Sequence, residues 1–295
     1  MSPETIFIGC RFVHILSLMV VFGQGLFTAM LAPAALRPRV SHDLRPVLLV
    51  ALPLMLCTAL AMIPVQAAQM GDGWRSALQA DAWRAVMHTD FGEVWAWHIA
   101  LAVATTLALA FPAAWRAAAL AMLGGMLLAS NGMVGHAAMR SGLAGALQRG
   151  NQMLHLLSAG AWLGTLPPLL HCLRYLRTGD AAHRANVVRA LRRFSQAGHV
   201  AVAVVVATGT VNTALILRTW PWPVHTPYRA LLDVKIALVA VMIAIALYNR
   251  YRLVPATRVK PSEATRALVR GTHREILLGA AVLALVSAFA TMDPS

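Results

Sequence analysis

Charged residues are scarce in this sequence of 295 residues, and acidic residues are fewer than half as numerous as basic ones. Asp, Glu, Lys and Arg together make up 12% of the chain, whereas the apolar types AVILMFWYC make up 59%. A soluble domain usually carries about 25% charged residues, so the composition excludes an ordinary water-soluble protein. Most apolar residues lie in runs long enough to cross a hydrocarbon core of about 30 Å. We therefore predict an all-α, polytopic membrane helix bundle.

The sequence also lacks the patterns that mark disulfide-linked domains and soluble enzymes. Its three cysteines, Cys10, Cys57 and Cys172, are an odd number inside or at the edges of the apolar runs, which argues against a disulfide framework. It has no phosphate-binding loop, nucleophile elbow or HExxH motif, so we do not expect an enzyme. The first residues include Glu4 and lack the basic segment of a signal peptide. The first apolar run is therefore expected to remain as a helix.

Eight apolar runs predict about eight transmembrane helices in a single membrane domain of residues 1–295. Residues 1–137 are expected to form a first four-helix half, and residues 150–291 a second. The segment 68–91, with its Asp and Trp residues, is expected to include a short amphipathic helix at the membrane surface. The transmembrane helices are expected near residues 5–31, 46–67, 92–112, 116–136, 151–173, 194–217, 229–249 and 273–291.

The distribution of positive charge predicts which way the helices cross the membrane. If the N-terminus lies outside, the inner loops hold 17 of the 25 basic residues. Inner loops of membrane proteins carry an excess of Lys and Arg, so we predict that both termini lie on the outer side. The net charge of +14 resides mainly in these short loops, and a nucleic-acid partner is therefore not expected.

A weak internal repeat relates the two expected halves. The segment 14–23 recurs as 155–164, with His, Leu, Ser and Gly at identical offsets, and His98 in the third helix aligns in the same way with Lys235 in the seventh. This pattern predicts two parallel halves related by a pseudo-twofold axis along the membrane normal, as in some transporters. The alternative is a chance match between apolar helices that draw on few residue types.

Four histidines lie in the outer halves of four expected helices. They are His14 in the first helix, His98 in the third, His136 at the outer end of the fourth and His155 in the fifth. Ionisable groups inside a bilayer are costly and usually face the bundle interior. We therefore expect these four side chains to open toward one outward-facing polar cavity, although any single buried histidine can also serve as a hydrogen-bonded structural residue.

Two methionines accompany this histidine group. Met133 lies one helical turn before His136, and Met153 lies two residues before His155. Imidazole binds copper, zinc and haem iron, whereas thioether sulfur selects Cu(I). The combination predicts a metal site, with copper as the ion, formed by His14, His98, His136, His155, Met133 and Met153. Ordinary packing by the methionines and axial ligation of haem b by a histidine pair are the alternatives.

Several short segments carry a resemblance to a known family. In order and spacing, the chain resembles the bacterial copper resistance protein D family through nearly its whole length, most clearly from about residue 130 onward. The carrying segments are Gly135-His136-Ala137, His155 through Gly164 with Trp162, Arg193-Phe-Ser195 with Gly198, Thr208-Gly209 with Asn212, Lys235, and Asn249-Arg250 with Pro255.

This resemblance implies copper handling at the bacterial inner membrane, with both termini in the periplasm. Copper is expected to move from the periplasm toward the cytoplasm through the outward-facing His and Met site. A small periplasmic copper-binding protein is the partner that the resemblance implies, beside copper and the lipid bilayer. Two alternatives stay open: an electron-transfer protein that binds haem b, and a periplasmic copper sensor or scaffold that does not transport.

Overall fold

The computed structural model describes residues 1–135, 142–178, 180–217, 226–257, 259–289 and 291–292. Within these ranges the regular structure is entirely helical, with no strand, which confirms the predicted all-α class. In chain order the elements are α1 (Pro3–Leu26), η1 (Phe27–Leu31), α2 (Arg37–Asp43), α3 (Arg45–Met70), η2 (Gly73–Leu78), α4 (Ala80–Met87), α5 (Asp90–Leu107), η3 (Ala108–Ala110), α6 (Ala113–Ser130), η4 (Asn131–Met133), α7 (Gly142–Leu163), α8 (Leu166–Thr178), α9 (Ala181–Leu217), α10 (Pro227–Tyr248), η6 (Asn249–Leu253), α11 (Val254–Ala256) and α12 (Pro261–Phe289).

Eight helical stretches in the described part of the chain are long and apolar enough to cross a membrane, as predicted. Two of them begin earlier than the apolar runs indicated: α9 begins at Ala181 rather than near residue 194, and α12 begins at Pro261 rather than near residue 273. The added turns are rich in Ala and Arg, which are strong helix formers. These helices therefore continue beyond the apolar segment, and the predicted boundaries were wrong there.

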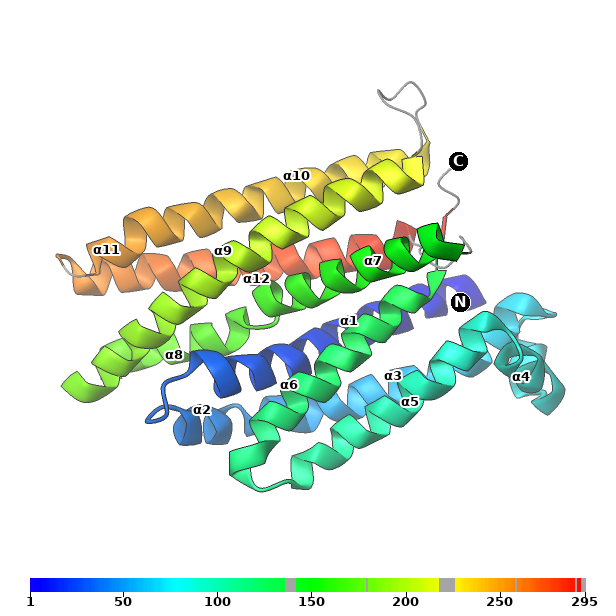
Figure 1. Cartoon of the computed structure of the whole chain (residues 1–295), viewed down its shortest axis with the longest axis horizontal. Coiled ribbons are helices and arrows are strands. Elements are labelled where there is room, and N and C mark those ends of the chain that lie inside the picture. Colours follow the sequence, from blue (N-terminus) through cyan, green and yellow to red (C-terminus); the bar gives the residue numbers. More distant parts are fainter. Residues whose placement is uncertain (136–141, 179, 218–225, 258, 290, 293–295) are drawn as a thin grey trace.

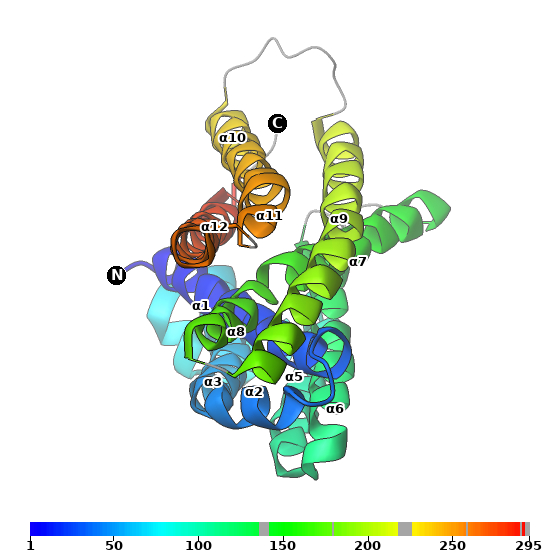
Figure 2. The same ribbon diagram turned by 90° about the vertical axis from the view of Figure 1, so that its left-hand side faces the viewer.

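The helices run roughly side by side, so that both chain termini lie at one end of the bundle (Figure 1). We call this the terminal end, and we call the opposite end, which carries α2 and α11, the basic end. The short helix α4 lies at the terminal end (Figure 1), within the segment where an amphipathic helix was predicted. In the view along the bundle, α1, α7 and α8 lie between a group formed by α3, α5 and α6 and a group formed by α9, α10 and α12 (Figure 2).

Helix α1 is the centre of the packing. It contacts α3 and α6 of the first predicted half as well as α7 and α12 of the second. Leu18 and Val21 on α1 are fully buried in the main apolar cluster. The two four-helix halves stay a prediction, but α1 is clearly the element through which the N-terminal and C-terminal helices meet.

The crossing of α1 and α7 depends on two glycines. A Cβ atom added to Gly23 would lie 2.0 Å from the backbone carbonyl carbon of Gly164, and one added to Gly164 would lie 2.2 Å from the Met19 carbonyl oxygen. Such small residues allow helix backbones to approach closely in membrane proteins. The Gly at this repeat position is therefore explained by backbone contact between the two helices.

The fifth membrane stretch is interrupted just after this crossing, between α7 and α8. Pro167 and Pro168 follow the break and have no backbone N–H to donate to the preceding turn. The Thr165 hydroxyl donates to the Ala161 carbonyl at 2.6 Å. This bond satisfies a carbonyl group in the last turn of α7, as buried backbone in a membrane requires.

A polar cross-link joins α2 to α8 at the basic end. The Tyr175 hydroxyl donates to Asp43 Oδ2 at 2.5 Å, and His171 Nε2 lies 3.2 Å from the same oxygen. The hydrogen bond from Tyr175 is the main cause that holds the pKa of Asp43 at about 2, below its ordinary value of 3.8. Asp43 is therefore a carboxylate at neutral pH and ties the loop between the first two membrane helices to the interrupted fifth one.

The glycine crossing generates a stability prediction. We expect Gly23→Ala to lower the free energy of unfolding by about 1–3 kcal/mol or more, the usual cost of overpacking, because the new methyl group meets backbone atoms that have no rotamer freedom. The matched control is Gly9→Ala on the same helix, where an added Cβ meets nothing within 4 Å. Thermal unfolding in detergent measures the difference, and equal midpoints for the two variants would contradict the crossing.

Candidate metal site at a buried histidine pair

The structure brings two of the predicted ligands into direct contact. His14 on α1 and His98 on α5 place their Nε2 atoms 2.8 Å apart. Their relative exposures are 1% and 0%, so both imidazoles are enclosed by protein. Two helices far apart in the sequence therefore converge on a pair of nitrogen ligands in the half of the bundle near the terminal end.

Hydrogen bonding on α3 fixes the tautomer of His14. Its Nδ1 lies 3.1 Å from the Met55 carbonyl oxygen, which can only accept a hydrogen bond, so Nδ1 carries the proton. The Thr58 hydroxyl, 3.0 Å from the same nitrogen, already donates to the Leu54 carbonyl at 2.6 Å. In the neutral ring, Nε2 of His14 is therefore a bare lone pair that faces His98.

The ring of His98 has two possible tautomers because its partner is a hydroxyl. His98 Nδ1 lies 2.7 Å from Ser130 Oγ, and that oxygen lies 2.8 Å from the Leu127 carbonyl. If Ser130 donates to Leu127, it accepts from Nδ1, and both Nε2 atoms present lone pairs at 2.8 Å. Two facing lone pairs repel unless a cation lies between them. If Ser130 donates to His98 instead, the Nε2 proton of His98 bonds to His14.

Aromatic side chains hold the pair in place. The Trp95 ring stacks on His98 with a centroid distance of 4.4 Å and an interplanar angle of 12°. The indole N–H of Trp95 donates to the Ala59 carbonyl at 2.8 Å. The Phe91 ring also stacks on Trp95, with a centroid distance of 5.0 Å. The imidazole of His98 therefore has little freedom to rotate, which suits a preorganised ligand.

A cavity of about 830 Å³ leads from the terminal end to His14. Its wall includes the imidazole of His14 and the indole of Trp95. It also includes the thioether of Met62, the amide of Asn131, and the opposite charges of Arg11 and Glu4. The buried histidine pair is thus reached, at His14, by a cavity from the terminal end.

His155 lies in a separate environment. Its Nδ1 is 3.0 Å from Thr208 Oγ1 on α9, and that hydroxyl donates to the Val204 carbonyl at 2.6 Å. Nδ1 of His155 is therefore the donor, and its Nε2 is a lone pair in the neutral ring. Lys235 on α10 is close enough to act electrostatically on this ring. The alignment of His98 with Lys235 stays a prediction.

The remaining predicted ligands do not join the pair. Met133 is 41% exposed at the end of the fourth membrane stretch. Met153 packs against Gly132, where an added Cβ would lie 2.9 Å from the Met153 side chain. His136 lies outside the described residues. Among the described residues no group of three or more His, Cys, Asp or Glu side chains is placed to hold a metal ion. The pair His14 and His98 is accordingly a two-nitrogen site.

Sequence reasoning missed four residues that build this site: Thr58, Met62, Trp95 and Ser130. One signal was available, because Trp95 lies three residues before His98 and residues at that spacing share a helix face. The others are on α3 and α6, and their contact with His14 or His98 depends on how those helices are rotated. An apolar helix gives no periodicity from which that rotation follows.

Comparison with known proteins gives consistent matches over nearly the whole chain. Residues 1–146 match the family model described as copper resistance protein D-like, N-terminal domain, and residues 188–289 match the model of copper resistance protein D. The chain is 37% identical to inner membrane protein YebZ of Escherichia coli strain K12, over 97% of this chain and 98% of the relative. No solved structure matches.

Two further relatives carry copper in their names. The chain is 30% identical to copper resistance protein D of Pseudomonas syringae pv. tomato, over 97% of this chain and 96% of the relative. It is 31% identical to copper transport protein CutJ of Bacillus subtilis strain 168, over 63% of this chain and 35% of that longer relative.

The geometry of the pair generates a binding prediction. We expect His14→Ala and His98→Ala each to weaken Cu(I) binding by about 100-fold or more, because each removes one of two nitrogen ligands. Ser130→Ala, which removes a partner that orients the ring, is expected to cost about 10–100-fold. Competition with a coloured Cu(I) chelator measures the affinities. His88→Ala, an exposed histidine near the terminal end, is the control, and a loss no larger than this control would contradict the site.

Proposed function

Because the chain belongs to the copper resistance protein D family and is a multi-pass inner-membrane protein, we propose that it carries copper through the membrane from the terminal end to the basic end. In this proposal the cavity at the terminal end admits copper, and His14 and His98 bind it. The copper ion is cargo, so its residence at the pair is transient. The chain performs no covalent chemistry on it.

The 2.8 Å approach of the two Nε2 atoms is the observation that carries this proposal. Cu(I) is a closed-shell ion that accepts two nitrogen ligands in a line, and imidazole is a suitable copper ligand. Metal–imidazole bonds are about 2.0–2.1 Å long, so the ion requires the two nitrogens to separate by a little over 1 Å. In one tautomer of His98, Cu(I) takes the place of the proton between the rings. In the other tautomer, it removes the repulsion between the two lone pairs.

The surrounding groups support binding of a soft cation. Met62 places a thioether on the wall of the cavity that reaches His14, and thioether sulfur favours Cu(I). The Met55 carbonyl accepts from Nδ1 of His14. In the tautomer of His98 in which Ser130 accepts from Nδ1, both Nε2 lone pairs are left for the metal. Glu4 and Arg11 on the same wall balance one another in charge, so the copper ion enters a cavity without a net repulsive charge.

The haem alternative does not fit this pair. Axial ligation of a haem requires a porphyrin plane between the two imidazoles. Here the ring centroids of His14 and His98 are 4.9 Å apart at an angle of 55°, and Trp95 is stacked on His98. These rings leave no space for a macrocycle, whereas a single copper ion requires only a small displacement.

Uptake of copper tests the proposed function directly. We expect cells that express His14→Ala or His98→Ala to accumulate copper at the level of cells without the protein, at least about 10-fold below the parent's protein-dependent uptake. His88→Ala should match the parent. Whole-cell copper by mass spectrometry, normalised to the amount of protein in the membrane, gives the result. Parental accumulation in the His14 and His98 variants would refute transport through this pair.

The direction of the proposed transport requires the terminal end to be periplasmic. We expect a reporter that is active only in the periplasm to be active when it is fused after Ser295 or before Met1, because the basic loops lie at the other end of the bundle. A fusion in the segment between α2 and α3 should be active only with a cytoplasmic reporter. Cytoplasmic activity at both termini would reverse the proposed direction.

A further inference from the structure

A second polar site lies in the other half of the molecule, toward the basic end. A cavity of about 230 Å³ is enclosed by α7, α8, α9, α10, η6 and α12, and most of its wall is apolar. Several residues that carried the family resemblance gather there and are not used by the histidine pair. They are Trp162, Ser195, Gly198, Asn249 and Arg250, joined by His199 and Glu275.

Glu275 is a buried acidic residue within this cavity. It lies in the middle of the membrane stretch α12 and is only 3% exposed. The Asn249 amide donates to its Oε1 at 2.7 Å, and the Trp162 indole lines the same cavity. Within the described part of the chain, no Lys, Arg or His lies within ion-pair distance of this carboxyl group. A buried carboxylate without a cation is costly, so this group requires a proton or a bound cation.

The local backbone is arranged around this carboxyl group. Asn249 begins η6, a π-helical turn that follows α10, and such turns occur frequently at functional sites. Gly271 lies one helical turn before Glu275, and a Cβ there would be 2.3 Å from Asn249 Oδ1. The glycine and the π-helical turn together bring the amide against α12 so that it can donate to Glu275.

The other charged and titratable groups around the cavity have their own partners. The Arg250 guanidinium donates to Ser195 on α9 and lies 5.4 Å from the centre of the Tyr251 ring. His199 Nε2 lies 3.1 Å from the Tyr251 hydroxyl.

The remaining helices packed against α12 add no nearby charge to this cavity. From α7 and α8 its lining consists of the Trp162 indole and apolar side chains. Lys235 on α10 lies beside Phe289, about four helical turns from Glu275. Arg11 and Glu4 on α1 belong to the cavity at the terminal end.

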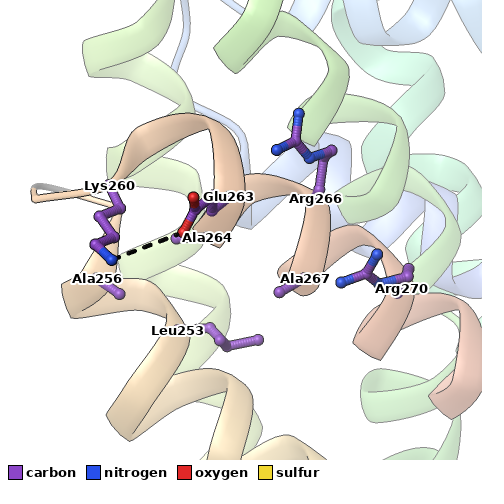
Figure 3. Close-up of a pocket in the computed structure, with 8 residues that line it drawn as sticks. All are labelled: Leu253, Ala256, Lys260, Glu263, Ala264, Arg266, Ala267 and Arg270. Atoms are coloured by element: carbon purple, nitrogen blue, oxygen red, sulfur yellow. Dashed lines mark ion pairs between the residues drawn. The ribbon is translucent and has the colours of Figure 1, made fainter.

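A second hollow, of about 440 Å³, lies on the side of the basic end, between the η6–α11 segment and α12 (Figure 3). Arg266, Arg270 and the Lys260–Glu263 pair surround it, with Lys260 Nζ 3.9 Å from Glu263 Oε2. It opens beside the same elements that carry Asn249 and Glu275.

We propose that Glu275 is a proton-binding site that exchanges its proton with the basic end and couples proton movement to copper transport. In the proton-loaded state one Glu275 oxygen carries the proton while Asn249 hydrogen-bonds to the carboxyl group. On release, the O–H bond breaks, the proton passes to water in the cavity, and the resulting carboxylate keeps the Asn249 donor. The coupling rests on the proposed copper transport, whereas the proton site itself does not.

Infrared difference spectroscopy on the full chain tests the proton site without copper. We expect the parent to show a carboxylic C=O band that disappears as pH rises, and Glu275→Gln to lack it. Glu263→Gln removes an exposed carboxyl group on the same helix and should keep the band. If Glu275→Gln does not fold, Glu275→Asp keeps a carboxyl group and should shift the band. A band that is unchanged in folded Glu275→Gln, or unshifted in Glu275→Asp, would overturn the proposal.

Proteoliposomes with an internal pH dye test the coupling. With Cu(I) supplied together with ascorbate, we expect the parent and Glu93→Gln, which changes an exposed carboxyl group on α5, to move protons with copper. We expect the proton flux of Glu275→Gln to be at least about 10-fold lower. Glu275→Gln should keep its Cu(I) affinity within about twofold, because the histidine pair is elsewhere. Proton flux equal to the parent's would overturn the coupling. His14→Ala should lose copper transport but keep the infrared band, so failure of the histidine site and failure of the proton site give different results.

Discussion

The structure depends on one constraint: a polar group inside the bilayer must find its partner within the protein, because lipid supplies none. The buried hydroxyl groups of Thr105, Thr272 and Ser287 meet it by donating to carbonyl groups of the preceding helical turn. Gln24 meets it across elements, by donating to the Leu44 carbonyl at 3.1 Å. Imidazole and carboxyl groups differ from these hydroxyl and amide groups because they can also take up a proton or a metal ion. A hydrogen bond to the backbone does not by itself decide whether such a group is protonated or metal-bound. The histidine pair and Glu275 are the groups of this kind on which the proposed copper site and the proposed proton site rest.

The two halves of the chain use related positions for different chemistry. In the N-terminal half, a histidine on α1 faces a histidine on α5. In the C-terminal half, His155 on α7 instead contacts the Thr208 hydroxyl on α9. Among the described residues, only the first arrangement brings the ring nitrogens of two histidines together. The interactions on the C-terminal side are instead amide-rich: Asn151 donates to Asn212 at 2.8 Å, and Asn212 donates to Gln152 at 2.8 Å. The proposed copper site and the proposed proton site accordingly fall in different halves.

Length and apolarity were sufficient to predict eight membrane helices, because both properties are local. The rotation of each helix was not predictable. Met122 and Met126 share a helix face with Met133, yet they are 61% and 51% exposed, so this face is directed away from the bundle interior. The sequence does not distinguish that face from the opposite one, since both are apolar. Glu275 was not singled out from the sequence. Its helix had been expected to begin near residue 273, whereas α12 begins at Pro261 and encloses Glu275 in its middle.

The contact of Gly23 with Gly164 has a consequence for how this chain can diverge. Elsewhere in the bundle, a larger side chain on one helix can be offset by a smaller one on its neighbour. At this crossing backbone meets backbone, and no residue is smaller than glycine, so neither position can compensate for a change at the other. Any sequence that replaces one of them must displace a whole helix. Because the helix break before Pro167 follows this crossing directly, that displacement would be transmitted to α8 and to the cavity that contains Glu275.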